Sequence, residues 1–94
     1  MDCDKVMFTV HALRRMFERR IGMDDVIQAV RVGQVIQEYP DDAPHPSFLL
    51  WNGNLAHPLH VVVARNDKGG ECVVVTVYIP GTNAWMPDFI TRRT

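Results

Sequence analysis

The sequence predicts an α+β fold, in which an N-terminal helical hairpin packs on one face of an antiparallel sheet of about four strands. Helical spacing of apolar residues fills the first third of the chain, and strand-like runs fill most of the rest. Two β-branched runs, at 58–65 and 71–79, flank an Asn-Asp-Lys-Gly-Gly reversal and predict a long hairpin. A length of 94 residues favours a single domain, 1–94.

Composition argues against several classes of protein. The formal net charge of −1 counts against bulk electrostatic capture of nucleic acid, although a local basic patch would be compatible with it. Cys3 and Cys72 are too few for a disulfide framework or a metal quartet, so we expect two free thiols. No apolar run is long enough to span a bilayer and no signal peptide is evident, which predicts a cytoplasmic protein without a membrane partner.

Two helices are expected after a brief strand that begins near Met7. Thr9 is a suitable N-cap for a helix over residues 10–19. Its expected buried face carries the apolar side chains Val10, Leu13, Met16 and Phe17. The second helix begins at Asp24 and Asp25, where acidic side chains suit the helix dipole, and ends at Gly33. Its expected apolar stripe consists of Val26, Ile27 and Val30.

Shorter elements surround the long hairpin. Residues 34–39 predict an edge strand because both of its faces are mixed, and residues 47–51 predict a second strand followed by a tight turn at 52–54. Between these strands, residues 40–46 contain three prolines and form a stiff loop. In the tail, Trp85 and Phe89 are four residues apart, which predicts a short helix docking two aromatic rings on the core.

The hairpin has two unlike faces. Side chains alternate along a strand, so the odd-numbered residues of the two runs form an apolar set expected to pack in the core: Leu59, Val61, Val63, Val73, Val75, Val77 and Ile79. The even-numbered residues include His60, Thr76 and Tyr78, and we call their side of the sheet the mixed face. A symmetric hairpin places His60 opposite Thr76.

Several stretches together resemble the bacterial domain of unknown function family 4258. They are Phe-Thr-Val-His-Ala-Leu-Arg-Arg-Met at 8–16, Tyr-Pro-Asp-Asp-Ala-Pro-His-Pro-Ser at 39–47, Pro-Leu-His-Val-Val-Val-Ala at 58–64 and Thr-Val-Tyr at 76–78. Trp85, Asp88-Phe89 and Arg92-Arg93 complete the pattern, so the resemblance covers nearly the whole chain. The family usually has Gly at the position of Arg20 and tends to have Tyr at that of His45.

This resemblance implies a layout similar to RelE, ParE and BrnT toxins of type II toxin–antitoxin modules. By that analogy we expect a metal-independent endoribonuclease acting on messenger RNA, without a cofactor, inhibited by a protein antitoxin of the zinc-ribbon, helix-turn-helix type. The alternative is a non-catalytic binding module that uses the mixed face or the edge strand 34–39. A homodimer through the mixed face is a third expectation.

Metal-free RNA cleavage needs a base, an acid and cations that stabilise the phosphate. His60 and Tyr78 are the acid/base candidates on the mixed face, and Thr76 lies beside them. Phosphate-binding candidates are Arg15, Arg19 and Arg92, and further candidates are His11 and Asp42. The structural alternatives are a hydrogen-bonded core histidine, a solvated helix face and a turn-capping aspartate. The stripe His11–Arg15–Arg19 lies opposite the helix's expected apolar side, so it should not reach the mixed face.

Overall fold

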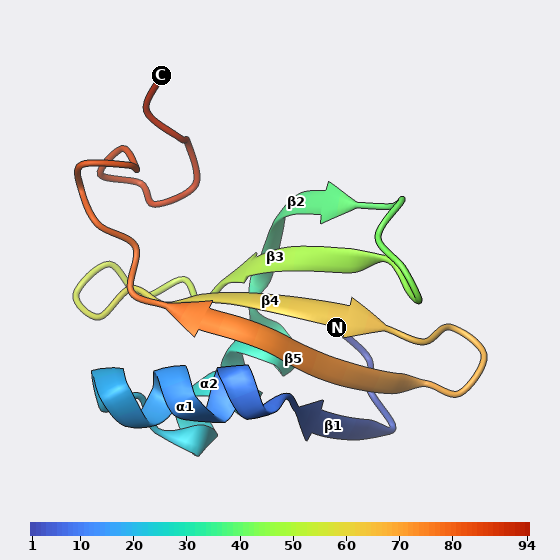
Figure 1. Ribbon diagram of the computed structural model, residues 1–94. Coiled ribbons are helices and arrows are strands. Elements are labelled where there is room, and N and C mark those ends of the chain that lie inside the picture. The colour runs from blue at the N-terminus through green and yellow to red at the C-terminus, as the bar shows by residue number, and fades with distance from the viewer.

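The computed structural model describes residues 1–94 as two helices and a five-stranded mixed sheet (Figure 1). In chain order the elements are β1 (Lys5–Phe8), α1 (Val10–Arg19), α2 (Met23–Val32), β2 (Gln34–Tyr39), β3 (Ser47–Trp51), β4 (His60–Arg65) and β5 (Glu71–Tyr78). The strand order is β1-β5-β4-β3-β2. The α+β class is confirmed, but the expectation of about four antiparallel strands is corrected, because β1 pairs in parallel with β5.

Both helices lie against one face of the sheet, and the C-terminal tail lies over the other (Figure 1). The larger core cluster, of twelve buried residues, lies between the helices and the sheet. The mixed face carries a smaller cluster built on Leu49, Trp51, Trp85 and Phe89. As predicted, β2 is an edge strand. Neither helix is long and apolar enough to cross a membrane.

Helix α1 begins and ends where its sequence signals indicate. The hydroxyl of Thr9 accepts a hydrogen bond from the backbone N–H of Ala12 at 3.0 Å, which satisfies one of the free donors of the first turn. At the other end Arg20 adopts a left-handed conformation with φ of 56°. Glycine reaches this region without steric cost, whereas a residue with a Cβ atom, such as Arg20, is strained there.

The buried face of α1 differs from the predicted one. Ala12 and Met16 are buried, whereas Val10, Leu13 and Phe17 are 71%, 43% and 87% exposed. The prediction was wrong because the sheet edge, rather than helical spacing alone, sets the orientation of α1. Its first turn is attached to β5 through Thr9, and this rotates the apolar stripe toward solvent.

Helix α2 follows its prediction more closely. Val26 and Val30 are buried and Ile27 is partly buried. The helix stops at Gly33, where a Cβ atom would clash with the carbonyl oxygen of Ala29 and lie 2.8 Å from that of Trp51. Glycine is therefore required here by close backbone approach to β3.

The long hairpin contains a β-bulge that changes which residues face the helices. His60 pairs with Tyr78 and Val62 with Thr76, but Val63 pairs with Val74, so Val75 is an extra residue. Beyond the bulge the alternation in β5 is reversed. The core therefore receives Cys72, Val74 and Val77, together with Leu59, Val61 and Val63 of the opposing segment. The predicted core positions Val73, Val75 and Ile79, and the pairing of His60 with Thr76, were wrong.

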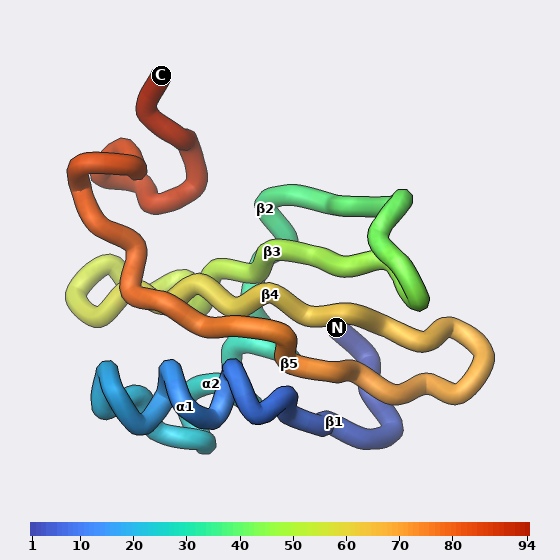
Figure 2. Tube along the Cα trace, in the orientation of Figure 1, coloured from blue at the N-terminus to red at the C-terminus, as the bar shows by residue number.

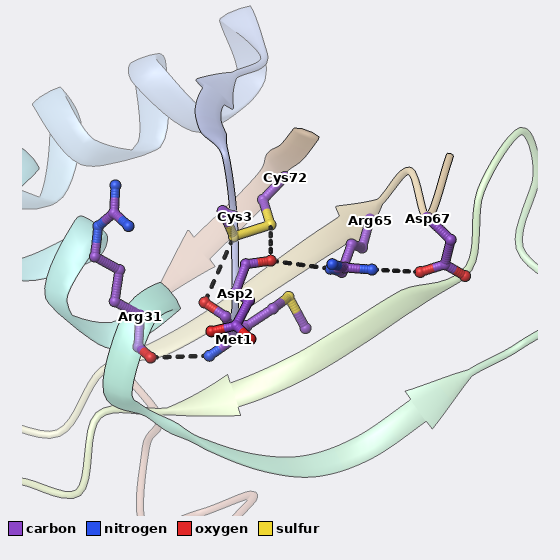
Figure 3. Close-up of a disulfide and its surroundings, with 7 residues drawn as sticks. All are labelled: Met1, Asp2, Cys3, Arg31, Arg65, Asp67 and Cys72. Atoms are coloured by element: carbon purple, nitrogen blue, oxygen red, sulfur yellow. Dashed lines mark hydrogen bonds and ion pairs between the residues drawn. A yellow bond between two sulfur atoms is a disulfide. The ribbon is translucent and has the colours of Figure 1, made fainter. Parts of the chain in front are cut away.

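The two cysteines are not free thiols. Cys3 and Cys72 form a disulfide that joins the segment before β1 to the start of β5 (Figure 3). Beside it, the guanidinium of Arg65 donates to the carbonyl oxygen of Asp2 at 3.0 Å and pairs with Asp67. Sequence spacing gave no sign of this pair, because residues 69 positions apart meet only through the parallel pairing of β1 with β5.

The tail after β5 turns back over the mixed face without forming the expected helix (Figure 2). Trp85 and Phe89 are 4% and 9% exposed, so the predicted docking of both aromatic rings is confirmed. A single antiparallel bridge joins Trp85 to Arg92. The tail is thus ordered by its contacts with the sheet rather than by local helical structure.

Substitutions in α1 test which face stabilises the fold. We expect Met16→Ala to lower the free energy of unfolding by about 2–5 kcal/mol, because it leaves a cavity in the core. Phe17→Ala should change it by less than about 0.5 kcal/mol, because that ring is exposed. Urea unfolding of both variants measures the difference. A larger loss for Phe17→Ala would contradict the orientation described for α1.

Arg20→Gly tests the left-handed helix end. We expect it to raise the free energy of unfolding by about 0.5–1 kcal/mol, since relief of the left-handed conformation exceeds the added flexibility of the unfolded chain. The matched control is Arg19→Gly, which should lower it by about 1 kcal/mol because Arg19 is helical. Thermal unfolding would show the melting temperatures of the two variants shifting in opposite directions. Shifts in the same direction would contradict the assignment.

Candidate functional site on the mixed face

His60 and Tyr78 are brought together at the end of the sheet that the tail covers. Their pairing across β4 and β5 places both side chains on the mixed face. Nδ1 of His60 lies 3.0 Å from the hydroxyl oxygen of Tyr78, and Nε2 lies 2.8 Å from the carbonyl oxygen of Phe89. The ring of Trp85 packs edge-on against His60 with centroids 4.5 Å apart. His60 is 0% exposed, whereas Tyr78 is half-buried.

The hydrogen bonds of His60 fix its tautomer. A carbonyl oxygen only accepts, so Nε2 must carry the proton that it donates to Phe89. In the neutral ring the lone pair of Nδ1 then accepts from the hydroxyl of Tyr78. Burial lowers the pKa of His60, with the bond to the Phe89 carbonyl opposing that effect. The imidazole is therefore neutral at pH 7 and holds the tyrosine proton in a defined direction.

Tyr78 also sits in a specific charge environment. Burial raises its pKa, nearby Tyr39 raises it further, and the guanidinium of Arg92 opposes both effects. Arg92 lies over the ring of Trp85, 5.7 Å from the ring centroid, in a cation–π contact. The site thus combines a protonated phenol, a neutral imidazole and an exposed cation. The indole N–H of Trp51, in the same cluster, is buried without a hydrogen-bond partner.

Other predicted site residues lie elsewhere. Nε2 of His11 is 3.0 Å from the hydroxyl of Thr76, so the first turn of α1 does reach the rim of the mixed face, contrary to expectation. Arg15 is half-buried on α1, and Arg19 lines a hollow between the helices and the loop before β4. Asp42 accepts a hydrogen bond from the hydroxyl of Ser47, which is consistent with a structural role in the proline-containing loop.

A second hollow, of about 300 Å³, occupies the uncovered part of the mixed face. Val62, Ala64 and Val73 are among its lining residues, together with the proline-containing loop. No three His, Cys, Asp or Glu side chains come together as metal ligands would. The polar side chains in the lining of this hollow include Asp42, His45 and Ser47.

Sequence reasoning missed two features, one at this site and one at the hollow beside Arg19. One is the carbonyl oxygen of Phe89, because backbone atoms have no sequence signal. The other is His57, which lines the hollow beside Arg19 and was considered only as a metal ligand. Its position after a tight turn, next to an Asn-rich segment, was the available signal.

Protonation of His60 should destabilise the fold. The pKa of His60 is lowered in the folded state, while that of an unfolded histidine is about 6.5, so the unfolded chain binds the proton more readily. The contribution of neutral His60 to the free energy of unfolding is fully present above about pH 6.5. It is lost as the pH falls toward the pKa of His60 in the folded state. Urea unfolding between pH 7.5 and 5 should show this fall, and His60→Gln should flatten it. An unchanged pH slope in His60→Gln would contradict it, and His57→Gln serves as an exposed control.

Comparison with known proteins gives one match. A family model described as Domain of unknown function (DUF4258) matches residues 8–79. No curated protein and no solved structure shows significant similarity to the chain. The matched range runs from the end of β1 to the residue after β5, and so includes His60 and Tyr78 but excludes Cys3 and the tail. The chain belongs to the DUF4258 family.

Proposed function

We propose that the protein is a metal-independent endoribonuclease, the toxin of a toxin–antitoxin pair. The observation that carries the proposal is the half-buried Tyr78 hydroxyl, held by the neutral His60 and within the electrostatic influence of Arg92. Each of the three supplies one requirement of RNA cleavage: a group that exchanges a proton with the ribose, a proton acceptor behind it, and a cation for the phosphate.

The proposed reaction proceeds as a proton relay. The 2′-hydroxyl of the ribose gives its proton to the oxygen of Tyr78 while the tyrosine proton moves to Nδ1 of His60. The 2′-oxygen then bonds to phosphorus, and the bond from phosphorus to the 5′-oxygen breaks, leaving a 2′,3′-cyclic phosphate. The departing 5′-oxygen takes a proton from water, and the hydroxide that remains takes the extra proton from His60, which restores the neutral imidazole. The carbonyl of Phe89 stabilises the imidazolium, and Arg92 neutralises charge on the phosphate.

A non-catalytic binding function is the second candidate, and two observations favour it. Both ring nitrogens of His60 are already occupied and the ring is fully buried, as in a structural histidine that fastens the tail. Edge strand β2 is largely exposed, with an irregularity between Val35 and Gln37, and is open to strand addition. In this reading the partner is a protein. In the toxin reading an antitoxin of the zinc-ribbon, helix-turn-helix type covers the mixed face, and self-association through that face is the remaining arrangement.

An RNA cleavage assay with purified protein, in the presence of a metal chelator, distinguishes the two functions. We expect wild-type protein to cleave single-stranded RNA to 2′,3′-cyclic phosphate ends. Tyr78→Phe and His60→Gln should each lower the rate by about 100-fold or more, because each breaks the relay. The control Arg14→Gln changes an exposed residue of α1 that lines neither hollow, and it should keep the wild-type rate.

The cleavage rate is measured by separating labelled RNA on gels and quantifying the label. Circular dichroism shows whether each variant is folded. Wild-type protein without cleavage, or folded Tyr78→Phe with the wild-type rate, would contradict the relay. Absence of cleavage in every protein would favour the binding function.

A further inference from the structure

A hollow larger than that on the mixed face lies on the helix side of the sheet, away from His60 and Tyr78. Its volume is about 460 Å³, and we call it the hairpin hollow because it lies between the α1–α2 connection and the loop at 52–59. Figure 2 shows that loop beside the C-terminal end of α1. The lining residues are Arg19, Arg20, Ile21, Asp25, Asn52, Asn54, Ala56, His57, Pro58, Leu59 and Ile79.

Positive charge gathers at this hollow although the chain as a whole carries a net charge of −1. Arg19 and Arg20 both line it, and neither forms an ion pair, because the single ion pair of the molecule joins Arg65 and Asp67. Asp25 is the one carboxylate in the lining, and it lies in the first turn of α2, where the helix dipole offsets its charge. The two arginines therefore leave a net positive site.

The wall opposite the arginines is held rigidly by side-chain hydrogen bonds. Oδ1 of Asn52 accepts from the backbone N–H groups of Asn54 and Leu59 at 3.2 and 3.1 Å. Oδ1 of Asn54 accepts from the N–H groups of Ala56 and His57, both at 3.0 Å. The backbone of His57 is held by two hydrogen bonds, its N–H to Oδ1 of Asn54 and its carbonyl oxygen to Nδ2 of Asn52, and neither uses its ring. Preorganised walls reduce the ordering cost of binding a ligand.

The α1 side of the hollow is fixed as well. The left-handed conformation of Arg20 turns the chain sharply between the helices, and its N–H is bonded to the carbonyl oxygens of Met16 and Phe17. Gly22, the N-cap of α2, offers no side-chain cap to the first turn of that helix. That turn carries the carboxylates of Asp24 and Asp25, which offset the helix dipole, so the attraction for an anion comes from the arginines.

We propose that the hairpin hollow binds the phosphate group of a nucleotide. Guanidinium groups suit phosphate because they donate two parallel hydrogen bonds to its oxygens, and the ring of His57 supplies a further donor. The apolar side chains of Ile21, Pro58 and Ile79 form the rest of the wall and suit a ribose or base face. The phosphate belongs either to a free mononucleotide or to an RNA strand, which share this chemistry.

The hollow is independent of the proposed cleavage chemistry. Leu59 and Ile79 line it, whereas their neighbours His60 and Tyr78 point to the opposite face of the sheet. A binding measurement that involves no cleavage therefore tests the hollow alone, and failure of the relay leaves the result unaffected.

Isothermal titration at low salt provides the test, with 5′-AMP, adenosine and a 2′-O-methyl RNA oligomer as probes. The 2′-O-methyl group removes the attacking hydroxyl, so the oligomer cannot be cleaved by the relay. The variant is Arg19→Gln combined with Arg20→Gly, since glycine suits the left-handed position and should keep the fold intact. The matched control is Arg14→Gln, which removes an exposed guanidinium of α1 outside the lining.

We expect wild-type protein and Arg14→Gln to bind 5′-AMP or the oligomer, and the double variant to bind about tenfold or more weakly. Adenosine should bind more weakly than 5′-AMP, because it lacks the phosphate. Preference for 5′-AMP identifies a free nucleotide as the source of the phosphate, and preference for the oligomer identifies a strand. The proposal would be overturned if Arg14→Gln and the double variant bound with the same affinity. It would also be overturned if wild-type protein bound neither phosphate-bearing probe.

Discussion

Thr9 anchors the first helix to the sheet at the point where β5 carries its extra residue. Its hydroxyl donates to the carbonyl oxygen of Val75 at 2.9 Å and accepts from the N–H of Ala12, while its own N–H bonds the carbonyl oxygen of Val74. The bulge at Val75 reverses the alternation of side chains in β5. Without that reversal, Cys72 and Tyr78 would lie on one face. With it, the disulfide forms on the helix side while the tyrosine reaches the mixed face.

The C-terminal tail, like the bulge, fixes the arrangement of side chains on the mixed face. His60 bonds the carbonyl of Phe89 with one nitrogen and the hydroxyl of Tyr78 with the other, so one buried ring joins the tail to the sheet. This arrangement is compatible with either proposed function, since the hydrogen bond from Tyr78 to Nδ1 can fasten the tail or carry a proton to the ring. A ligand on this face would contact the half-buried Tyr78 and the exposed Arg92, because His60 itself is fully buried.

Charge is distributed unevenly around the sheet. No arginine of α1 forms an ion pair, and two arginines at its C-terminal end line the hairpin hollow. Arg92 lies beyond the opposite face, on the tail. A chain with a net charge of −1 thus presents cations at two separate places on either side of β4 and β5. Screening by salt makes phosphate recognition depend on nearby groups more than on net charge, which is the basis of both proposals.

The sequence by itself determined the elements that depend on local chemistry: the cap at Thr9, the stop at Gly33, the edge strand and the docking of two tail aromatics. It also placed His60 and Tyr78 on one face, because both lie on the same side of the bulge. Tertiary structure decided the rest. The exposure of Phe17, the pairing of β1 with β5, the disulfide and the meeting of Arg19 with His57 all depend on contacts between distant segments. Periodicity describes one element at a time, so it cannot detect a bulge whose anchor is 66 residues away.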